Sequence, residues 1–382
     1  MNILFVTDTY TPNVNGVVIS IENYRKNLSE LNHKVYIVAP KYPYYKFSEN
    51  VIPVRSIPFW GQKEYRFSFP FKVLRKTRWS KLKLDIIHTH TIFNLGIFGY
   101  YLSKRLNIPL VHTYHTYYEK YVHYSYIPQF ISKPAARLYS RYYLGKCDLV
   151  IAPSQKIINV LKNYGVKNKI VSLPTGIGNI KKYSEEEIHD FKRKFQRTPK
   201  TKLLLFVGRI AQEKNIELLI KAVFNLLNEK ADVVLLLVGD GPRKKHLQKF
   251  VTSAGKEDHI IFTGYIPYED IGLYYSISDI FVFSSVTETQ GLVILEALSY
   301  GLPVVAVKAG PTCDLVKNEV NGLLTENSEI DFFQKLKNVI YNENLLNKLK
   351  NRDDEKIKEL STLNQCIKLI DYYKEVIEER NT

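Results

Sequence analysis

The 382-residue sequence is poor in cysteine. Cys147, Cys313 and Cys366 lie far apart and match no spacing that holds zinc, which predicts a reducing compartment with neither disulfides nor a structural metal. No run of about 18 apolar residues occurs, so a transmembrane helix is not expected. The N-terminus lacks the basic start and the long apolar core of a signal peptide, and its first residues indicate a strand instead.

Acidic residues are scarce in one half of the chain only. Residues 1–180 carry 25 Lys and Arg against 8 Asp and Glu, a net charge of +17, whereas residues 181–382 carry 29 against 30, a net charge of −1. This asymmetry indicates that the first half meets an anionic partner, either nucleic acid or an anionic membrane. No helix-turn-helix, zinc-finger or RNA-recognition pattern accompanies the charge, which disfavours nucleic acid.

Aromatic residues are interleaved with this positive charge. Residues 59–83 contain eight Lys and Arg, seven aromatic residues and a single acid, and residues 117–146 are rich in tyrosine and basic residues. Aromatic rings at headgroup depth beside Lys and Arg suit an anionic bilayer surface, at about 1 kcal/mol per basic residue. The alternatives are a solvated basic loop for residues 59–83 and a buried tyrosine-rich helix for residues 117–146.

The glycine fingerprint G-x-G-x-x-G is also missing, which disfavours a dinucleotide cofactor. Short apolar runs alternate instead with segments of helical spacing, first through one half of the chain and then through the other. This alternation predicts an α/β protein with two doubly wound, Rossmann-like domains, at residues 1–178 and 196–360. The predicted strands are 2–7, 33–39, 85–90, 109–115, 148–152 and 169–173, then 203–207, 233–238, 260–262, 280–283 and 304–307.

The clearest candidate site lies within residues 279–307, where a strand, a polar loop, a short helix and another strand follow one another. Glu288 in the loop and Glu296 in the helix can both face the carboxyl ends of the strands, where open α/β sheets bind ligands. A carboxylate accepts two sugar hydroxyls, and the amides around Gly291 and Leu292 are helix N-terminal donors that suit a phosphate. Alternatively, the glutamates are a solvated loop acid and an exposed helix acid.

Other candidates stand at further predicted strand ends. Arg209 and Lys214 would hold a diphosphate without a metal, unless they are an ordinary surface pair. The amide of Gly16, at a loop-to-helix junction, suits a phosphate or simply belongs to an N-cap turn. His115 could hydrogen-bond a sugar hydroxyl or orient a phosphate, whereas we interpret His112 as a core histidine. No carboxylate pattern accompanies these histidines, so no metal is expected.

Taken together in their order, these motifs resemble glycosyltransferase family 4, whose members are retaining, nucleotide-sugar-dependent enzymes of the GT-B fold. The matching motifs are D-T-x-x-P-x-x-x-G, Y-H-T, G-R-x-x-x-E-K-N, V-G-D-G-P, and two glutamates eight residues apart followed by A-L-S-Y-G-L-P-V-V-A. The resemblance implies two Rossmann-like domains that face each other across a cleft. It also implies that the final helix, residues 363–382, packs back on the first domain, and that the sugar nucleotide binds mainly to the second.

The resemblance further implies roles for individual residues. Glu296 would hold the ribose hydroxyls, Glu288 the transferred sugar, and His115 the same sugar near its 6-position. The leaving diphosphate would help to take the acceptor proton, so neither a carboxylate nucleophile nor a metal or other cofactor is expected. The implied donor-binding residues are Gly16, Arg209, Lys214, Glu288, Gly291, Leu292 and Glu296, and the implied catalytic residues are Arg209, Lys214, Glu288 and His115.

Two segments resemble more narrowly the 1,2-diacylglycerol 3-glucosyltransferase branch: V-H-T-Y-H-T-Y-Y-E-K-Y-V-H-Y and T-E-T-Q-G-L-V-I-L-E. The commoner family form has Gly-Phe where Thr289 and Gln290 stand here, a departure that affects the sugar contacts. This resemblance implies transfer of glucose from UDP-glucose to diacylglycerol with retention, giving an α-glycolipid. The enzyme would be cytoplasmic and peripherally bound to the inner face of the membrane, with Asp8, Tyr117 and Tyr121 as acceptor candidates.

Several alternatives remain open at this stage. The donor sugar is glucose or galactose. One alternative is another family 4 enzyme that adds a hexose to an exopolysaccharide or to a lipid-linked sugar, and another is a GT-B relative of a different reaction class, such as a sugar-nucleotide epimerase. Charge alone would also suit a nucleic-acid-binding protein.

Overall fold

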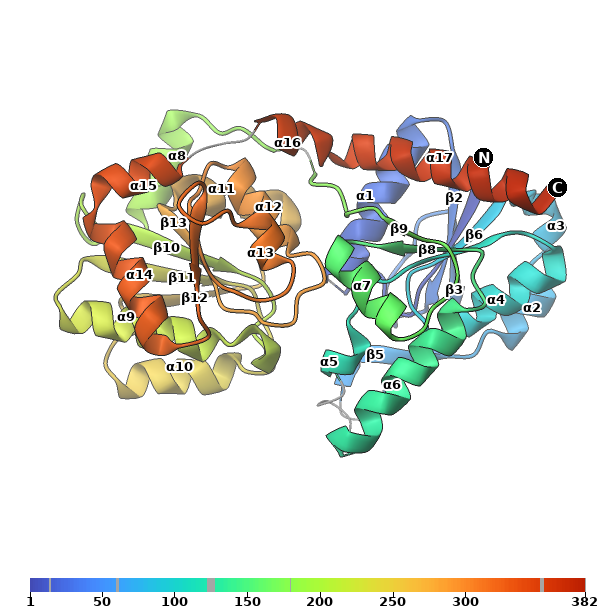
Figure 1. Ribbon diagram of the computed structural model, residues 1–382, viewed down its shortest axis with the longest axis horizontal. Coiled ribbons are helices and arrows are strands. Elements are labelled where there is room, and N and C mark those ends of the chain that lie inside the picture. Colours follow the sequence, from blue (N-terminus) through green and yellow to red (C-terminus); the bar gives the residue numbers. More distant parts are fainter. Residues whose placement is uncertain (14, 60–61, 122–127, 179, 351–353, 382) are drawn as a thin grey trace. The chain divides into compact units, whose positions relative to one another are not determined.

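The computed structural model describes residues 1–13, 15–59, 62–121, 128–178, 180–350 and 354–381 (Figure 1). The chain divides into two compact units, Met1–Gly178 with Glu359–Thr382, and Asn179–Lys358. The sequence prediction began the second domain at residue 196. Residues 179–195 belong to the second unit because the helix they contain packs there, with Phe191 against Tyr274 at 5.1 Å between ring centroids.

Among the described residues, the first unit is built on one sheet of seven parallel strands, in the order β3-β2-β1-β6-β7-β8-β9. Its strands are continuous apolar runs, as in Ile3–Val6, because helices cover both faces of the sheet. Their bounds are β1 (Asn2–Val6), β2 (Lys34–Pro40), β3 (Val51–Val54), β6 (Ile86–Thr89), β7 (Leu110–Thr113), β8 (Leu149–Ala152) and β9 (Ile170–Ser172).

The other elements of the first unit are its helices and a hairpin. They are α1 (Gly16–Glu30), β4 (Ser56–Phe59), β5 (Gln62–Ser68), α2 (Phe71–Lys76), α3 (Trp79–Leu82), α4 (Asn94–Leu106), α5 (Tyr118–Tyr121), α6 (Gln129–Leu144), α7 (Gln155–Asn163) and, at the C-terminus, α17 (Thr362–Asn381). Helix α17 lies alongside α1 (Figure 1), and its Leu369 and Tyr373 share a core cluster with Ile21 and Tyr24. The C-terminal helix is therefore part of the first unit.

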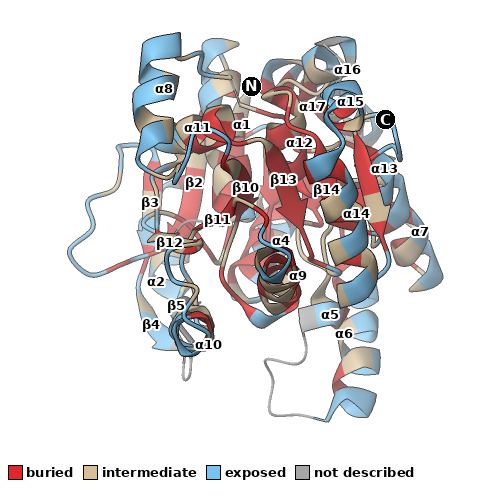
Figure 2. Ribbon diagram, turned by 90° about the vertical axis from the view of Figure 1, so that its left-hand side faces the viewer, coloured by how far each residue is buried: buried red, intermediate tan, exposed pale blue. Residues whose placement is uncertain are grey.

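The second unit repeats the architecture. Its described residues form a six-stranded parallel sheet in the order β12-β11-β10-β13-β14-β15. The strands are β10 (Lys202–Val207), β11 (Val233–Val238), β12 (Ile260–Gly264), β13 (Ile280–Phe283), β14 (Val304–Val307) and β15 (Gly322–Thr325), the last of which was not predicted from the sequence. The helices are α8 (Glu185–Arg193), the 3-10 turn η2 (Gln212–Lys214), α9 (Ile216–Asn228), α10 (Lys244–Ser253), α11 (Tyr268–Ile277), α12 (Leu292–Ser299), α13 (Thr312–Leu315), α14 (Glu329–Tyr341), α15 (Glu343–Leu349) and α16 (Asp354–Glu359). In Figure 2 the central strands are red, whereas much of α6, α8 and α10 is blue.

The predicted α/β class with two doubly wound domains is thus confirmed, and one detail of the prediction is wrong. Trp79 was grouped with the aromatic residues of a membrane-facing surface, but it is 5% exposed and packs against Phe98 in the core. Phe67, Phe69 and Phe71 of the same stretch are exposed. In the described part of the chain, no helix is both long enough and apolar enough to cross a bilayer.

Candidate active site

In the second unit, the candidate residues gather where the strand order reverses. Strands β10 and β13 are neighbours in the sheet although they are far apart in the sequence, and ligands bind at such a switch point in open α/β sheets. Arg209 and Lys214 follow β10, and Glu288 follows β13. The sequence prediction that these side chains stand at strand ends agrees with this topology.

Lys214 and Glu288 form a close ion pair. Lys214 Nζ lies 2.5 Å from Glu288 Oε1, and both side chains are largely shielded, at 17% and 16% exposed. The hydroxyls of Ser284 and Ser285 donate to the carbonyl oxygens of Lys214 and Glu213, at 2.7 and 3.3 Å. The loops after β10 and β13 are therefore joined by both backbone and side-chain contacts.

This pair decides the charge of Glu288. Burial by itself would raise the pKa of the carboxyl, but the charge and hydrogen bond of Lys214, with a bond from Ser285, outweigh it and lower the pKa. Glu288 is therefore ionised at neutral pH.

Glu296 has a different environment. It lies on α12, and both of its carboxylate oxygens accept hydrogen bonds from tyrosines of α11: Tyr275 Oη donates to Oε2 at 2.8 Å and Tyr268 Oη to Oε1 at 3.0 Å. Burial raises the pKa of Glu296, and the two tyrosine hydrogen bonds only partly oppose this. Sequence reasoning missed both tyrosines. Their spacing of seven, two helical turns, was the only signal of a shared face.

Helix α12 begins next to these carboxylates. Gly291 precedes it with φ at +82°, a left-handed conformation that favours glycine, and no described side chain caps the helix. The amides of its first turn, at Leu292 and Val293, point outward from the helix end and suit an anionic group. Gln290, where the family form has Phe, is 6% exposed.

Close backbone packing shapes the neighbouring turns. Gly208 and Gly239 follow β10 and β11 with φ at +151° and +140°, and a Cβ on Gly239 would lie 2.0 Å from the carbonyl oxygen of Gly208. A Cβ on Gly241 would lie 2.4 Å from the carbonyl oxygen of Ile210. The V-G-D-G-P and V-G-R turns therefore pack directly on each other beside Arg209.

In the first unit, Asp8 follows β1, also at a switch point, between β1 and β6. Its Oδ2 accepts from Thr91 Oγ1 at 2.6 Å, and its Oδ1 accepts from the amide of Leu95 in the first turn of α4 at 2.8 Å. Burial raises the pKa of Asp8 against these bonds. Asp8, predicted as an acceptor contact, thus already holds the start of α4.

Gly16 is the first residue of α1. Asn15 caps this helix, with its side-chain oxygen accepting from the amides of Val17 and Val18 at 3.0 and 3.1 Å. A Cβ on Gly16 would meet no atom within 4 Å. The N-cap turn, one of the two interpretations of Gly16 from the sequence, is therefore present. A phosphate contact from the Gly16 amide stays a prediction.

His115 follows β7 at the end of a row of imidazoles. Its Nε2 lies 2.9 Å from His90 Nδ1, and His90 stacks on His88 with 4.3 Å between ring centroids. His88 in turn bonds Tyr373 Oη of α17 at 2.5 Å and Thr113 Oγ1 at 2.7 Å. Burial lowers the pKa of His115 to about 3, so it is neutral near pH 7.

His88 and His90 were not singled out from the sequence. Their alternation in D-I-I-H-T-H predicts that both side chains point to one face of the strand expected at residues 85–90, and this was the available signal. His112 is fully buried, with Nδ1 2.9 Å from Thr89 Oγ1, as expected of a core histidine. Among the described residues, no group of three or more His, Cys, Asp or Glu is arranged to hold a metal ion.

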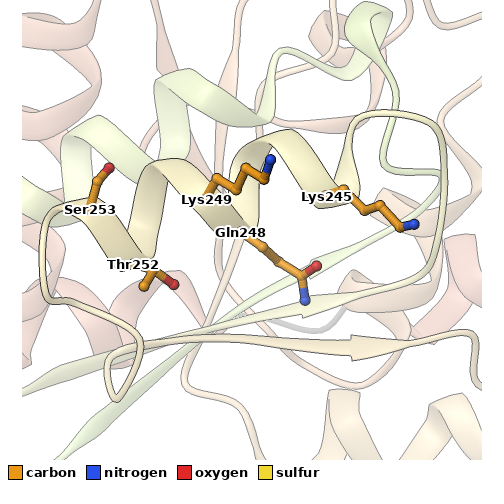
Figure 3. Close-up of a pocket in the computed structure, with 5 residues that line it drawn as sticks. All are labelled: Lys245, Gln248, Lys249, Thr252 and Ser253. Atoms are coloured by element: carbon orange, nitrogen blue, oxygen red, sulfur yellow. The ribbon is translucent and has the colours of Figure 1, made fainter.

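The remaining predicted acceptor residues are tyrosines. Tyr117 is half-buried and packs against the core of the first unit. Tyr121 ends α5, and its side chain lies outside what the structure describes. A shallow hollow along α10 (Figure 3) is lined by Lys245, Gln248, Lys249, Thr252 and Ser253, and it shares no residue with the candidate site.

Two family models match the chain in succession. Residues 14–178 match the model described as Glycosyltransferase Family 4, and residues 187–356 match the model described as Glycosyl transferases group 1. The two matches follow the division into units.

The chain is similar over most of its length to curated proteins. It is 35% identical over 332 residues to an alpha-monoglucosyldiacylglycerol synthase of Streptococcus pneumoniae, covering 85% of this chain and 75% of the relative. It is 32% identical over 346 residues to the protein of the same name from Acholeplasma laidlawii, covering 86% of each. A GDP-mannose-dependent alpha-mannosyltransferase of Corynebacterium glutamicum is 28% identical over 88% of this chain and 79% of the relative.

Solved structures share the fold. Sucrose-phosphate synthase from Thermosynechococcus elongatus superposes with a TM-score of 0.83 at 21% identity, covering 99% of this chain and 100% of that one. Anabaena HepE in complex with UDP and glucose superposes with a TM-score of 0.78 at 21% identity, covering 97% and 99%. With its two Rossmann-like units, the matches to the family models and its identity to the two synthases, the chain belongs to the family 4 glycosyltransferases of the GT-B fold.

Proposed function

We propose that the protein is a retaining hexosyltransferase that moves glucose from UDP-glucose to 1,2-diacylglycerol in a membrane, giving an α-glycolipid. The observation that carries the proposal is the joining of the Arg209–Lys214 loop to Glu288, beside Glu296 and the start of α12. This arrangement offers cations and amides to a diphosphate and carboxylates to sugar hydroxyls. The identity to two alpha-monoglucosyldiacylglycerol synthases supports the choice of acceptor.

We assign the donor to the second unit. Glu296 receives the ribose hydroxyls and Glu288 the hydroxyls of the transferred sugar. Because Lys214 already neutralises Glu288, we assign the diphosphate chiefly to Arg209 and to the first amides of α12, with Lys214 holding Glu288 in place. In this proposal, fixed cations and amides supply the charge that a metal or other cofactor would otherwise supply, and none takes part.

The proposed chemistry is a same-face substitution at the anomeric carbon. The bond from this carbon to the diphosphate oxygen breaks as the bond to the acceptor hydroxyl oxygen forms, and the hydroxyl proton passes to the leaving phosphate. The rate gain comes mainly from stabilising the negative charge that grows on the diphosphate, the role we give to Arg209. Neutral His115 hydrogen-bonds the sugar and takes no part in the proton transfer.

We assign the acceptor to the first unit and to a lipid surface. Helix α6 exposes apolar side chains beside basic ones, with Phe130 at 78% and Leu138 at 67% exposed and Arg141 nearby. The hairpin similarly exposes Phe67, at 46%, and α2 exposes Phe71, at 75%, next to Lys72. Amphipathic basic helices of this kind bind anionic bilayers. The protein would then act peripherally at the inner face of the membrane.

Helix α6 is tied to α5 through Glu119. Arg137 Nη2 donates to Glu119 Oε1 at 2.6 Å, and Tyr164 Oη of the segment after α7 donates to Glu119 Oε2 at 2.6 Å. The bond from Arg137 lowers the pKa of Glu119, which stays ionised. These contacts hold α6 in place while its outer residues remain available to lipid.

A panel of radiolabelled donors tests the assignment. UDP-glucose, UDP-galactose and GDP-mannose are each supplied with anionic vesicles that contain or lack diacylglycerol. We expect label in the lipid extract with UDP-glucose and only when diacylglycerol is present. Transfer from GDP-mannose alone would move the protein toward the mannosyltransferase relatives, and turnover of the donor without any acceptor would indicate an epimerase or hydrolase.

A further inference from the structure

Glu296 is held by two tyrosines that differ in how deeply they are buried. Tyr275 is 2% exposed, and its ring stacks on that of Tyr300 with 5.3 Å between centroids. This stack depends on Gly272, because a Cβ there would lie 2.5 Å from Tyr300 Oη. Burial raises the pKa of Tyr275 well above its ordinary value, so its hydroxyl stays protonated and donates to Glu296 at every working pH.

Tyr268 approaches the same carboxylate from a less confined position. It is the first residue of α11, preceded by Pro267 at the helix end, and it is only half-buried. Its hydroxyl lies 3.0 Å from Oε1, the oxygen that Tyr275 does not contact. Glu296 therefore has one oxygen bonded to a fixed donor and the other bonded to a donor at the start of a helix.

The two ribose hydroxyls of a nucleotide need carboxylate oxygens that can accept. The bond from Tyr268 occupies one of the lone-pair directions of Oε1. A ribose hydroxyl that approaches Oε1 along this direction therefore competes with the Tyr268 hydroxyl. The oxygen bonded to Tyr275 also gives up one lone-pair direction, but Tyr275 is 2% exposed, so this bond persists when a ligand arrives and fixes the orientation of the carboxylate. The same type of side chain thus has opposite consequences at the two oxygens.

We propose that Tyr275 positions the Glu296 carboxylate for the ribose of the nucleotide, whereas Tyr268 occupies the carboxylate oxygen that a ribose hydroxyl takes on binding. This inference rests on the proposed function, which gives Glu296 to the ribose. It makes Tyr275 a positioning residue and Tyr268 a competitor that lowers nucleotide affinity. For a ligand that must displace Tyr268, the apparent affinity equals the intrinsic affinity multiplied by the fraction of the protein in which the oxygen is free.

The test is a set of calorimetric titrations with UDP and with 2′,3′-dideoxy-UDP, which lacks both ribose hydroxyls. Tyr275→Phe removes a hydrogen bond to a charged group, so UDP binding should weaken by roughly tenfold or more. Tyr268→Phe should strengthen UDP binding. Neither substitution should change the affinity for the dideoxy analogue, because that ligand makes no use of Glu296.

Tyr274→Phe is the matched control. Tyr274 lies beside Tyr275 on α11 and packs on Phe191, and its ring contacts place it on the α8 side of the helix. Its substitution should leave both affinities unchanged. This control separates loss of a hydroxyl at the carboxylate from general disturbance of α11, which would shift UDP and its dideoxy analogue together.

Several outcomes would overturn the inference. If both variants weaken UDP binding, Tyr268 is a partner of the nucleotide and not a competitor. If the dideoxy analogue shifts in parallel with UDP, or if no affinity changes, the tyrosines act on the fold and not on the ribose. GDP and 2′,3′-dideoxy-GDP are titrated in parallel. A wild-type protein that binds neither UDP nor GDP contradicts the proposed function itself, together with the inference that rests on it.

Discussion

Lys214 Nζ and Glu288 Oε1 lie 2.5 Å apart although the two residues stand 74 positions apart in the sequence. Their loops follow β10 and β13, which are adjacent in the sheet at the point where the strand order reverses. The pair neutralises a carboxylate where the donor is proposed to bind and fixes both loops before any ligand arrives. Lys214, which the sequence predicted as a diphosphate ligand, is therefore assigned chiefly to holding Glu288.

The first prediction concerns this pair. Lys214→Met leaves Glu288 ionised and largely shielded from water without its partner, so the free energy of unfolding should fall by about 2–4 kcal/mol. The double variant Lys214→Met/Glu288→Gln should lose less than the sum of the single variants, because the unpaired charge is gone. Urea titrations of the four proteins measure both effects.

The control for this cycle is the ion pair of Lys221 and Glu217 on α9. The two atoms are 3.0 Å apart, but the side chains are 41% and 40% exposed. Substituting Lys221 by Met should change the free energy of unfolding by no more than about 0.5 kcal/mol. Equal losses at the buried and the exposed pair would show that shielding of the Lys214–Glu288 pair has no energetic weight.

The second prediction concerns pH. Ribose hydroxyls donate to the ionised form of Glu296, and burial has raised the pKa of this carboxyl above its ordinary 4.5. The affinity for UDP should therefore fall as the pH drops through the raised pKa, and binding in that range should release a proton. Glu288 contributes little to this change, because its lowered pKa keeps it ionised.

Calorimetric titration of wild type and Glu296→Gln at a series of pH values isolates this effect. The titration of the phosphate groups of UDP is common to both proteins, so only the difference between them reports on Glu296. The variant should bind more weakly at neutral pH and should lack the additional acid-side loss. Parallel pH profiles would show that Glu296 does not contact the ribose.

The third prediction assigns the growing charge of the diphosphate to Arg209. Arg209→Ala should lower kcat at saturating donor by about 100-fold, since the lost interaction strengthens in the transition state. Arg197→Ala, at an exposed arginine 3.7 Å from Asp258 in the same unit, serves as the control and should leave kcat unchanged. An effect of Arg209→Ala on KM alone would mean that this residue only binds the donor.

Much of the fold follows from the sequence, because buried parallel strands are continuous apolar runs such as Leu203–Val207, which are recognisable locally. The start of α12 was also readable, from Gly291 and the helical spacing after it. Contacts between segments far apart in the sequence could not be predicted in this way. The bonds from Tyr268 and Tyr275 to Glu296 depend on how α11 packs against α12, and no local pattern encodes that packing.

The burial of individual aromatic residues also could not be predicted from the neighbouring sequence. Trp79 stands in a strongly basic stretch, so composition placed it on a surface, yet its ring is in the core against Phe98. Phe71, eight residues earlier, is exposed. A four-residue helix, α3, turns Trp79 inward, and so short an element is set by its tertiary contacts.

The fourth prediction concerns the membrane surface. Lys72, Arg75, Lys76 and Arg78 are exposed on and after α2, and replacing all four by Ser should weaken sedimentation with phosphatidylglycerol vesicles, most clearly at low salt. UDP affinity should persist, because the donor is assigned to the other unit.

The matched control removes the same charge from the second unit. Replacing Lys200, Lys230, Lys245 and Lys249 by Ser should leave vesicle binding largely intact, because these exposed lysines belong to the second unit, which does not carry the excess of positive charge. Equal losses in the two quadruple variants would mean that net charge alone, and no particular surface, brings the protein to the membrane.

Transfer of a hexose to a lipid is measured by incorporation of labelled glucose from UDP-glucose into vesicles of increasing diacylglycerol content. We expect lipid-extractable label to rise with diacylglycerol content and the product to be an α-glucoside in its proton spectrum. A labelled product that stays in the aqueous phase whatever the diacylglycerol content would contradict the proposed transfer.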